Sequence, residues 1–322
     1  MTILVTGGDG YIGWPTALRI ADRTDERVLA VDNFARREWV EEVGSVSATP
    51  VASIEERIDA AEETLGIRNL SFAEGDLAEK SFVDELLTVH EPSVIVHAAA
   101  QPSAPYSQIN GERANYTQHN NLQATRNLLW GLEAHDLTDT HFVETTTTGV
   151  YGAPEFPIPE GGTTMENDGQ RDDVPFPNMG GSWYHATKGF DAQNMRLANT
   201  QFDIPISDVR TAITYGTETE ETREDDRLKT RFDFDYYFGT VAHRFCAQAV
   251  AGYPVTVYGK GEQRKPFISL EDAVEGLAQI ALTDAAERPD DLTVYNQVTR
   301  AISIVEVAET IADAGDAYDL DV

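Results

Sequence analysis

Short apolar runs alternate along the chain with segments in which apolar residues recur every three to four positions. The first unit, residues 3–33, is an apolar strand, a glycine-rich turn, a helical pattern and a second strand that ends at Asp32. Strands are also expected at Leu70–Phe72, Ser93–His97, His141–Glu144 and Ile206–Arg210, and helices at Lys80–His90 and Gln118–His135. This alternation predicts an α/β fold with a doubly wound parallel sheet.

Two segments interrupt the alternation. An insertion at residues 36–69 contains Ser53 and Glu56, spaced as a capping box before a helix. Residues 152–181 hold five prolines among glycines and acidic residues, and we expect an irregular, ordered loop over the functional site. Beyond Thr211 the pattern loosens. We therefore divide the chain into a large domain over residues 1–180 and a smaller, mixed α/β substrate lobe over residues 181–322.

The chain is strongly acidic: 322 residues include 55 Asp and Glu against 24 Lys and Arg, a net charge of −31. Such a surface repels nucleic acid and anionic lipid, so we expect neither as a partner. Because lysine is scarce, we interpret the composition as adaptation to a high-salt cytoplasm, with an ordinary acidic enzyme as the alternative. No apolar run reaches the roughly 18 residues of a membrane span, and Cys246 is the single cysteine. A cytoplasmic protein without membrane insertion and without a metal site is expected.

A glycine motif lies between the first strand and the first helix. Gly7, Gly8, Gly10 and Gly13 satisfy the spacing that lets a backbone approach a pyrophosphate at a helix N-terminus. Asp32 closes the second strand, where a carboxylate can accept hydrogen bonds from ribose hydroxyls. These features predict a Rossmann domain that binds NAD. The same Asp32 would repel the extra phosphate of NADP, although Arg36 and Arg37 nearby are the counter-argument.

Tyr184 and Lys188 stand at positions i and i+4, so on a helix they share one face. An ammonium group beside a phenol lowers the pKa of the phenol, which then can remove a proton from a sugar hydroxyl during hydride transfer. Thr147, at the end of the strand that begins near His141, supplies a hydroxyl for the same substrate oxygen. The spacing therefore predicts a Thr147–Tyr184–Lys188 redox triad.

These motifs together resemble the extended short-chain dehydrogenases, in the branch of nucleotide-sugar epimerases and dehydratases. The strings GGDGYIGW, VDNFARR, TPVASIEER, QPSAPYS, YTQHNN, SWYHATK, RFDFD, FGTVAHRFCAQ and TVYGKGEQ are similar to UDP-sulfoquinovose synthases and span most of residues 1–270. The resemblance implies that UDP-glucose is oxidised at carbon 4, loses water across carbons 5 and 6, adds sulfite and is reduced again. It makes His185 a candidate for proton transfer or sulfite binding, and the product would enter a sulfolipid or a surface glycan.

The sequence departs from this pattern at two places. The family carries a glutamate in the strand-end motif, where this chain has Thr148 and Val150. Pro102 replaces a basic residue of the synthases. Either the acid for dehydration comes from elsewhere or the chemistry is simpler, so a UDP-sugar 4-epimerase or 4,6-dehydratase remains the alternative. A non-catalytic NAD-binding protein is disfavoured because the triad is intact.

The resemblance also assigns binding residues. For the cofactor they are Gly7, Gly10, Tyr11, Ile12, Gly13, Asp32, Asn33, Arg36, Asp76, Leu77, Ala98, Asn120, Tyr184 and Lys188. For the nucleotide sugar they are Gln101, Thr147, Thr214, Arg244, Tyr258 and the adjacent cations Arg264 and Lys265, between which the sequence does not choose. The aromatic residues of FDFDYYF are interpreted as packing. Helices that contain Asn120–Trp130 and Tyr184–Leu197 are expected to form the seam of a homodimer, as is common in this class.

Overall fold

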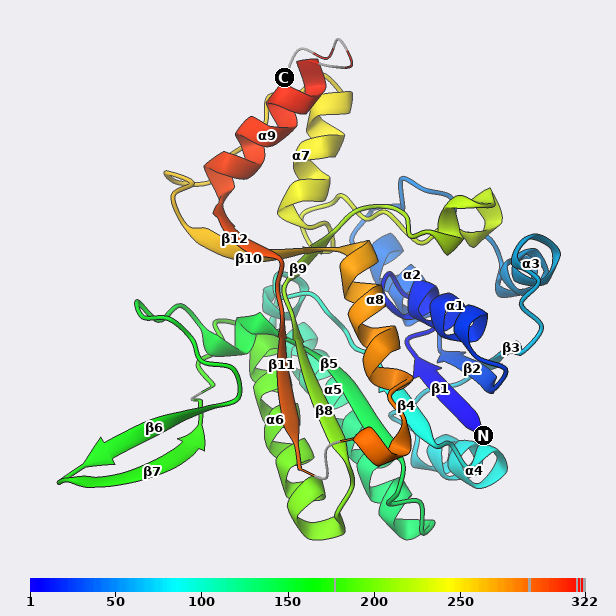
Figure 1. Ribbon diagram of the computed structural model, residues 1–322. Coiled ribbons are helices and arrows are strands. Elements are labelled where there is room, and N and C mark those ends of the chain that lie inside the picture. The colour runs from blue at the N-terminus through cyan, green and yellow to red at the C-terminus, as the bar shows by residue number, and fades with distance from the viewer. Residues whose placement is uncertain (177, 289–290, 317, 319, 321–322) are drawn as a thin grey trace.

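A seven-stranded parallel sheet forms the centre of the molecule (Figure 1). The computed structural model describes residues 1–176, 178–288, 291–316, 318 and 320. The strand order is β3-β2-β1-β4-β5-β8-β11. The strands are β1 (Thr2–Thr6), β2 (Arg27–Asp32), β3 (Leu70–Glu74), β4 (Val94–His97), β5 (His141–Thr147), β8 (Ile206–Thr211) and β11 (Thr293–Gln297). The predicted doubly wound sheet is confirmed.

Helices cover both faces of this sheet, which is why its central strands read as continuous apolar runs. On one face lie α1 (Gly13–Arg23) and α8 (Leu270–Ala281), and on the other α4 (Lys80–His90), α5 (Gly111–Ala134) and α6 (Trp183–Phe202). Trp14 and Leu277 are buried in the first layer, and Leu128 and Met195 in the second. Among the residues that the structure describes, there is no helix that is both long enough and apolar enough to cross a membrane.

The insertion after β2 forms α2 (Ala35–Glu42) and α3 (Ile54–Ala60). The predicted capping box at the start of α3 is confirmed. The Ser53 side chain accepts a hydrogen bond from the Glu56 amide, and the Glu56 carboxylate accepts one from the Ser53 amide. Two of the four amides that a helix start leaves unpaired are thereby satisfied locally.

A smaller lobe lies beyond the carboxyl ends of the strands (Figure 1). It consists of a three-stranded sheet with the strand order β12-β10-β9 and of two helices that pack against each other. Its elements are β9 (Ile213–Tyr215), α7 (Val241–Val250), β10 (Arg264–Ser269), β12 (Arg300–Ser303) and α9 (Ile304–Asp316). The boundary at residue 180 stays a prediction. After this residue in the sequence, β8 and β11 still belong to the seven-stranded sheet, and α6 packs against it.

The proline-rich segment is not irregular throughout. It contains a hairpin, β6 (Gly162–Asn167) and β7 (Gln170–Pro175), that extends away from the body of the molecule (Figure 1). The expectation of a wholly irregular loop over the site was therefore wrong for this part. Asp168 and Gly169, both with positive φ, make the two-residue turn that matches the twist of paired strands, and this Asp-Gly signal was present in the sequence.

Candidate active site

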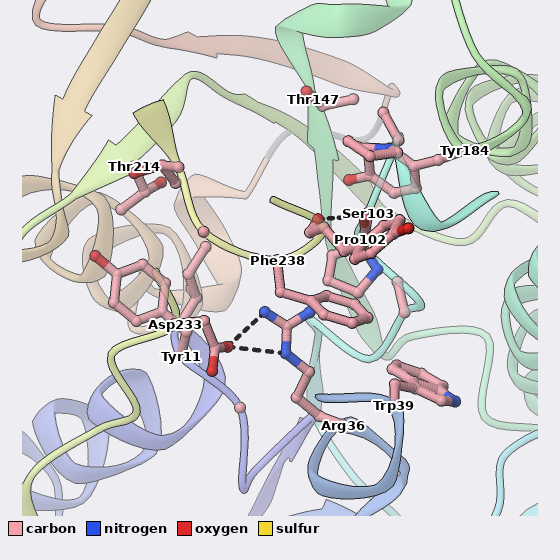
Figure 2. A pocket seen from close by; sticks show the side chains of 18 of the residues that line it. Tyr11, Arg36, Trp39, Pro102, Ser103, Thr147, Tyr184, Thr214, Asp233 and Phe238 are labelled. Atoms are coloured by element: carbon pink, nitrogen blue, oxygen red, sulfur yellow. Dashed lines mark hydrogen bonds and ion pairs between the residues drawn. The ribbon is translucent and has the colours of Figure 1, made fainter. Parts of the chain in front are cut away.

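A cavity of 590 Å³ lies between the carboxyl ends of the central strands and the small lobe (Figure 2). Most of the residues that the sequence singled out line it together. They are Gly7, Gly10, Tyr11, Ile12, Gly13, Asp32, Asn33, Arg36, Asp76, Leu77, Ala98, Asn120, Thr147, Tyr184, His185, Thr214, Arg244, Tyr258 and Lys265. Lys188, Gln101 and Arg264 are not part of this lining.

The glycine turn after β1 is as tight as the motif predicts. Gly7 has φ +74°, and a Cβ there would lie 2.8 Å from the backbone of Ala98, at the end of β4. A Cβ on Gly13 would lie 2.0 Å from the Gly7 carbonyl oxygen. No side chain caps the start of α1, whose first turn borders the cavity. This combination suits a phosphate group that approaches the backbone at a helix N-terminus.

Asp32 ends β2 with its carboxylate at the cavity. The amide of Asp9 donates to Oδ2 at 3.0 Å, and the amide of Phe34 donates to Oδ1 at 2.7 Å. Burial raises the pKa of Asp32 to about 6 against these hydrogen bonds. The carboxylate is thus fixed in position and available to ribose hydroxyls, so the residues present fit the adenosine half of NAD.

An ion pair that no sequence motif indicates lies in the cavity wall. The guanidinium of Arg36 lies 2.6 Å from Asp233 and 4.0 Å above the ring of Phe238 (Figure 2). Arg231 pairs with the same carboxylate at 2.8 Å. Asp233 and Arg231 come from the RFDFD string nearly 200 residues after Arg36 in the chain, and no local pattern signals their contact.

The aromatic residues that follow RFDFD also line the cavity. Phe238 packs with Trp39 and Tyr106, as expected for a packing residue, and it borders the cavity as well. Tyr236 is 57% exposed and lines the cavity, so the interpretation of this residue as packing was wrong. The spacing of aromatic residues does not distinguish a residue that packs in the core from one that lines the cavity, because this loop has no regular period.

Thr147 and Tyr184 lie at the same end of the cavity (Figure 2). Thr147 ends β5, and its Oγ1 accepts a hydrogen bond from the Gly149 amide at 3.1 Å, which leaves the hydroxyl hydrogen free to donate. Tyr184 lies in the first turn of α6, which Ser182 caps by accepting from the His185 amide. The end of β5 and the start of α6 thus place both residues at the same end of the cavity.

Lys188 lies one helical turn below Tyr184 and is buried. Its Nζ donates to Glu144 Oε1 at 3.0 Å and lies 3.9 Å from Asp191 Oδ2. Burial raises the pKa of Tyr184, and the charge of Lys188 opposes that rise. The direction of the lysine effect agrees with the predicted triad, although the net pKa of the phenol in this structure lies above its usual value.

His185 faces the cavity with one ring nitrogen engaged. Its Nδ1 lies 3.0 Å from Ser182 Oγ, and a Cβ on Gly149 would meet the imidazole at 2.4 Å. Burial, followed by the nearby charge of Lys265, lowers the pKa of His185. The ring is therefore neutral at neutral pH and suited to accept a proton.

The structure separates the two adjacent cations of GEQRKPF. Lys265 lines the cavity, whereas Arg264 is exposed and pairs with Glu306 at 3.1 Å. Successive side chains of β10 point to opposite sides, which is the physical reason for the difference. Arg244 lines the cavity and donates to the Gly239 carbonyl at 2.7 Å.

Gln101 is buried behind the cavity rather than in it. Its side chain lies 3.1 Å from Thr117 Oγ1, and its backbone amide donates to Asn121 at 2.8 Å. The neighbouring Pro102 does line the cavity (Figure 2). At the strand-end motif, Val150 is fully buried with Tyr151 in an apolar cluster, so this position supplies no acid to the cavity.

Comparison with known proteins places the chain in a family. A model of the "NAD dependent epimerase/dehydratase family" matches residues 3–296. The chain belongs to this family. It is therefore an NAD-dependent enzyme, and the expected cofactor is confirmed.

Two curated relatives are UDP-sulfoquinovose synthases. The chloroplastic protein of Spinacia oleracea is 37% identical over 320 residues, which is 99% of this chain and 65% of the relative. The protein of Sulfolobus acidocaldarius is 39% identical over 324 residues, 100% of this chain and 81% of the relative. The chain thus spans about two thirds of the length of the first and more of the second, and the resemblance noted from the sequence is confirmed.

Solved structures with lower identity share the fold. The UDP-glucose 4-epimerase of Thermotoga maritima, solved with UDP-glucose, has a TM-score of 0.71 at 20% identity and aligns with 98% of this chain and 83% of its own. The UDP-glucuronic acid 4-epimerase of Bacillus cereus, solved with UDP-glucuronic acid and NAD, has a TM-score of 0.69 at 21% identity, with the same coverage. At this identity the likeness supports the fold alone.

Proposed function

We propose that the protein is a UDP-sulfoquinovose synthase, which converts UDP-glucose and sulfite to UDP-sulfoquinovose through a 4-keto intermediate. The observation that carries the proposal is the 37–39% identity to two such synthases over almost the whole chain. The cavity supports it, because it brings a dinucleotide motif, the Thr147–Tyr184 pair and a set of cations into one space.

In this proposal the sugar carbon 4 lies beside Thr147 and Tyr184. The glycine turn and Asp32 would hold NAD, which would supply a reversible hydride acceptor for that carbon. Thr147 donates a hydrogen bond to the sugar oxygen, and Tyr184 removes its proton and restores it in the last step. Lys188 acts behind Tyr184, because its positive charge favours the ionised phenol.

A ketone at carbon 4 acidifies the proton at carbon 5, which makes the loss of water feasible. We assign the removal of that proton to His185, which faces the cavity as a neutral imidazole with Nδ1 held by Ser182. Arg244 and Lys265 are proposed to bind the UDP pyrophosphate, since both are cationic residues of the cavity lining in an otherwise acidic molecule. Sulfite is the proposed second substrate.

The decisive experiment incubates the protein and NAD with UDP-glucose, with and without sulfite, and identifies the products by mass spectrometry. We expect a UDP-linked sulfonate only when sulfite is present. Formation of UDP-galactose without any sulfonate would overturn the proposal and favour a 4-epimerase. A 4-keto-6-deoxy product would favour a 4,6-dehydratase.

A Tyr184→Phe variant tests whether the Tyr184 hydroxyl takes part in the reaction. It keeps the ring and its packing and removes the hydroxyl, so we expect the product rate to fall about 100-fold or more with unchanged folding. Glu166→Gln, on the exposed hairpin, is the matched control and should retain full activity.

We further propose a cytoplasmic homodimer in which α5 and α6 of two copies pack together. Trp130 on α5 and Phe190 and Leu197 on α6 support this seam, because all three are apolar and at least 52% exposed. Light scattering after size-exclusion chromatography should give twice the chain mass. A Leu197→Glu variant should then be a monomer, and a wild-type monomer at micromolar concentration would contradict the seam.

A further inference from the structure

Two carboxyl groups are buried directly behind the proposed catalytic tyrosine. Glu144 on β5 and Asp191 on α6 are both fully buried, and their nearest cation is Lys188. The Asp191 carboxyl interacts with the Glu144 carboxyl and with Thr125. Within the described part of the chain, Glu144 Oε2 and the carboxyl oxygens of Asp191 have no hydrogen bond of regular geometry to any other group. Two carboxylates and one ammonium group would leave a net negative charge in a dry interior, which is costly, so one proton must remain on the pair.

The other groups around this pair do not supply the missing positive charge. On β4, His97 is buried and held between Thr6 and Thr125, and burial lowers its pKa so that it stays neutral. On β8, Asp208 is already bound to Arg210 at 2.9 Å. Tyr184 is the remaining titratable neighbour. The shared proton therefore belongs to Glu144 and Asp191.

We propose that Glu144 and Asp191 share one proton and take up a second from Tyr184 through Lys188, so that this carboxyl pair activates the tyrosine base. Neither touches the substrate, so both are positioning residues that act through the proton held by Lys188. Their negative charges raise the pKa of Tyr184, and uptake of the second proton by the pair removes that effect. The inference rests on the proposed redox role of Tyr184 and adds a proton acceptor to it.

The step balances without any other reactant. Lys188 passes an ammonium proton to Glu144 and receives the phenolic proton of Tyr184. Tyr184 becomes a phenolate, Lys188 remains an ammonium ion and Glu144 becomes a carboxylic acid. The phenolate then takes the proton of the sugar hydroxyl, and each transfer reverses when the ketone is reduced. The total charge of the cluster is unchanged by the transfers among Tyr184, Lys188 and Glu144, which favours them in a buried site. It rises by one only when the phenolate takes the sugar proton, as the hydride leaves the same sugar carbon.

Burial and charge favour this role. Burial raises the pKa of Asp191 well above its usual value, and the charge of Glu144 raises it further. Burial also raises the pKa of Glu144, against the effect of Lys188. Burial lowers the pKa of Lys188, but the two carboxylates raise it more, so Lys188 stays protonated. The pair is thus a better proton acceptor than ordinary carboxylates.

The kinetic test follows the reduction of bound NAD by UDP-glucose in a single turnover as a function of pH. Glu144→Gln should be slower by about tenfold or more at pH 7 and should recover as the pH rises, because Tyr184 then loses its proton to solvent. In the plot of this rate against pH, the midpoint of the acidic limb should lie at least about one pH unit higher for Glu144→Gln than for the wild type. Glu144→Asp should restore much of the rate. An unchanged profile, or an equal loss at every pH, would overturn the proposal.

A second measurement needs no turnover. The measurement is the infrared difference spectrum between the wild type and Asp191→Asn at pH 7. The wild type should contribute the carbonyl stretch of a protonated carboxylic acid, because its carboxyl pair holds one proton. The variant should lack this band, because its remaining Glu144 is ionised beside Lys188. Glu221→Gln is the matched control: it alters a buried carboxylate that pairs with Arg19 away from this cluster, and it should change neither the band nor the pH profile. Absence of the band in the wild type would overturn proton sharing, whereas absence of NAD reduction with the band present would count only against the proposed function.

Discussion

The Asp9 carboxylate lies 2.8 Å from the guanidinium of Arg57, although 48 residues separate them in the chain. Asp9 belongs to the glycine turn, and Arg57 to α3 of the insertion. Arg57 is fully buried and stacks 4.2 Å above Trp14, and Arg37 pairs with the same carboxylate. The insertion is thus bonded directly to the turn that borders the proposed pyrophosphate site.

Arg57→Ala should destabilise the protein by about 3 kcal/mol, because it removes one partner of a buried ion pair and leaves a space above Trp14. Urea unfolding measures this change. We also expect less NAD to copurify with the variant. Arg227→Ala is the control, since Arg227 forms exposed pairs, and it should leave both quantities nearly unchanged. An unaltered NAD content in Arg57→Ala would contradict the link between insertion and turn.

The affinity for NAD should depend on pH through Asp32. Burial raises the pKa of this residue to about 6, and only the ionised carboxylate accepts hydrogen bonds from both ribose hydroxyls. Affinity should therefore be constant above pH 6 and fall as the pH decreases below it, approaching tenfold per unit, or about 1.4 kcal/mol. Calorimetric titration with NAD at several pH values measures this. Asp32→Asn should bind more weakly and lose the dependence.

Low salt should destabilise the protein. The net charge is −31, and cations such as Arg19, Arg23 and Arg227 already form ion pairs. The carboxylates in excess therefore repel one another, and salt screens this repulsion. We expect the Tm to fall by about 10 °C or more when KCl is lowered from about 2 M to about 0.05 M. An equal Tm at both concentrations would remove the interpretation as a halophilic protein.

The β6–β7 hairpin should be dispensable for folding. Its side chains are mostly exposed, and its strands bond to each other. Replacing residues 163–174 by two glycines should change the free energy of unfolding by less than about 1 kcal/mol and leave the cavity intact. Activity against UDP-glucose should persist. A loss of activity in a folded variant would restore the earlier expectation of a segment that covers the site.

Local patterns in the sequence were enough for the large domain and the cofactor half of the site. Apolar runs and helical periodicity predicted the strands and helices because each pattern reflects the period of one element. Gly7, Gly13 and Asp32 were identifiable because a tight turn needs glycine and a strand end fixes the carboxylate. The i, i+4 spacing of Tyr184 and Lys188 likewise depends only on the helix that carries them.

The tertiary structure decided what depends on contacts between distant segments. Arg36 with Asp233, Arg57 with Asp9, and Lys188 with Glu144 each join residues from different elements. No local pattern specifies such pairs, because the sheet order and the packing of α6 and the small lobe bring them together. The sequence therefore determined which side chains are available for chemistry, and the fold determined which of them are paired, buried or open to a substrate.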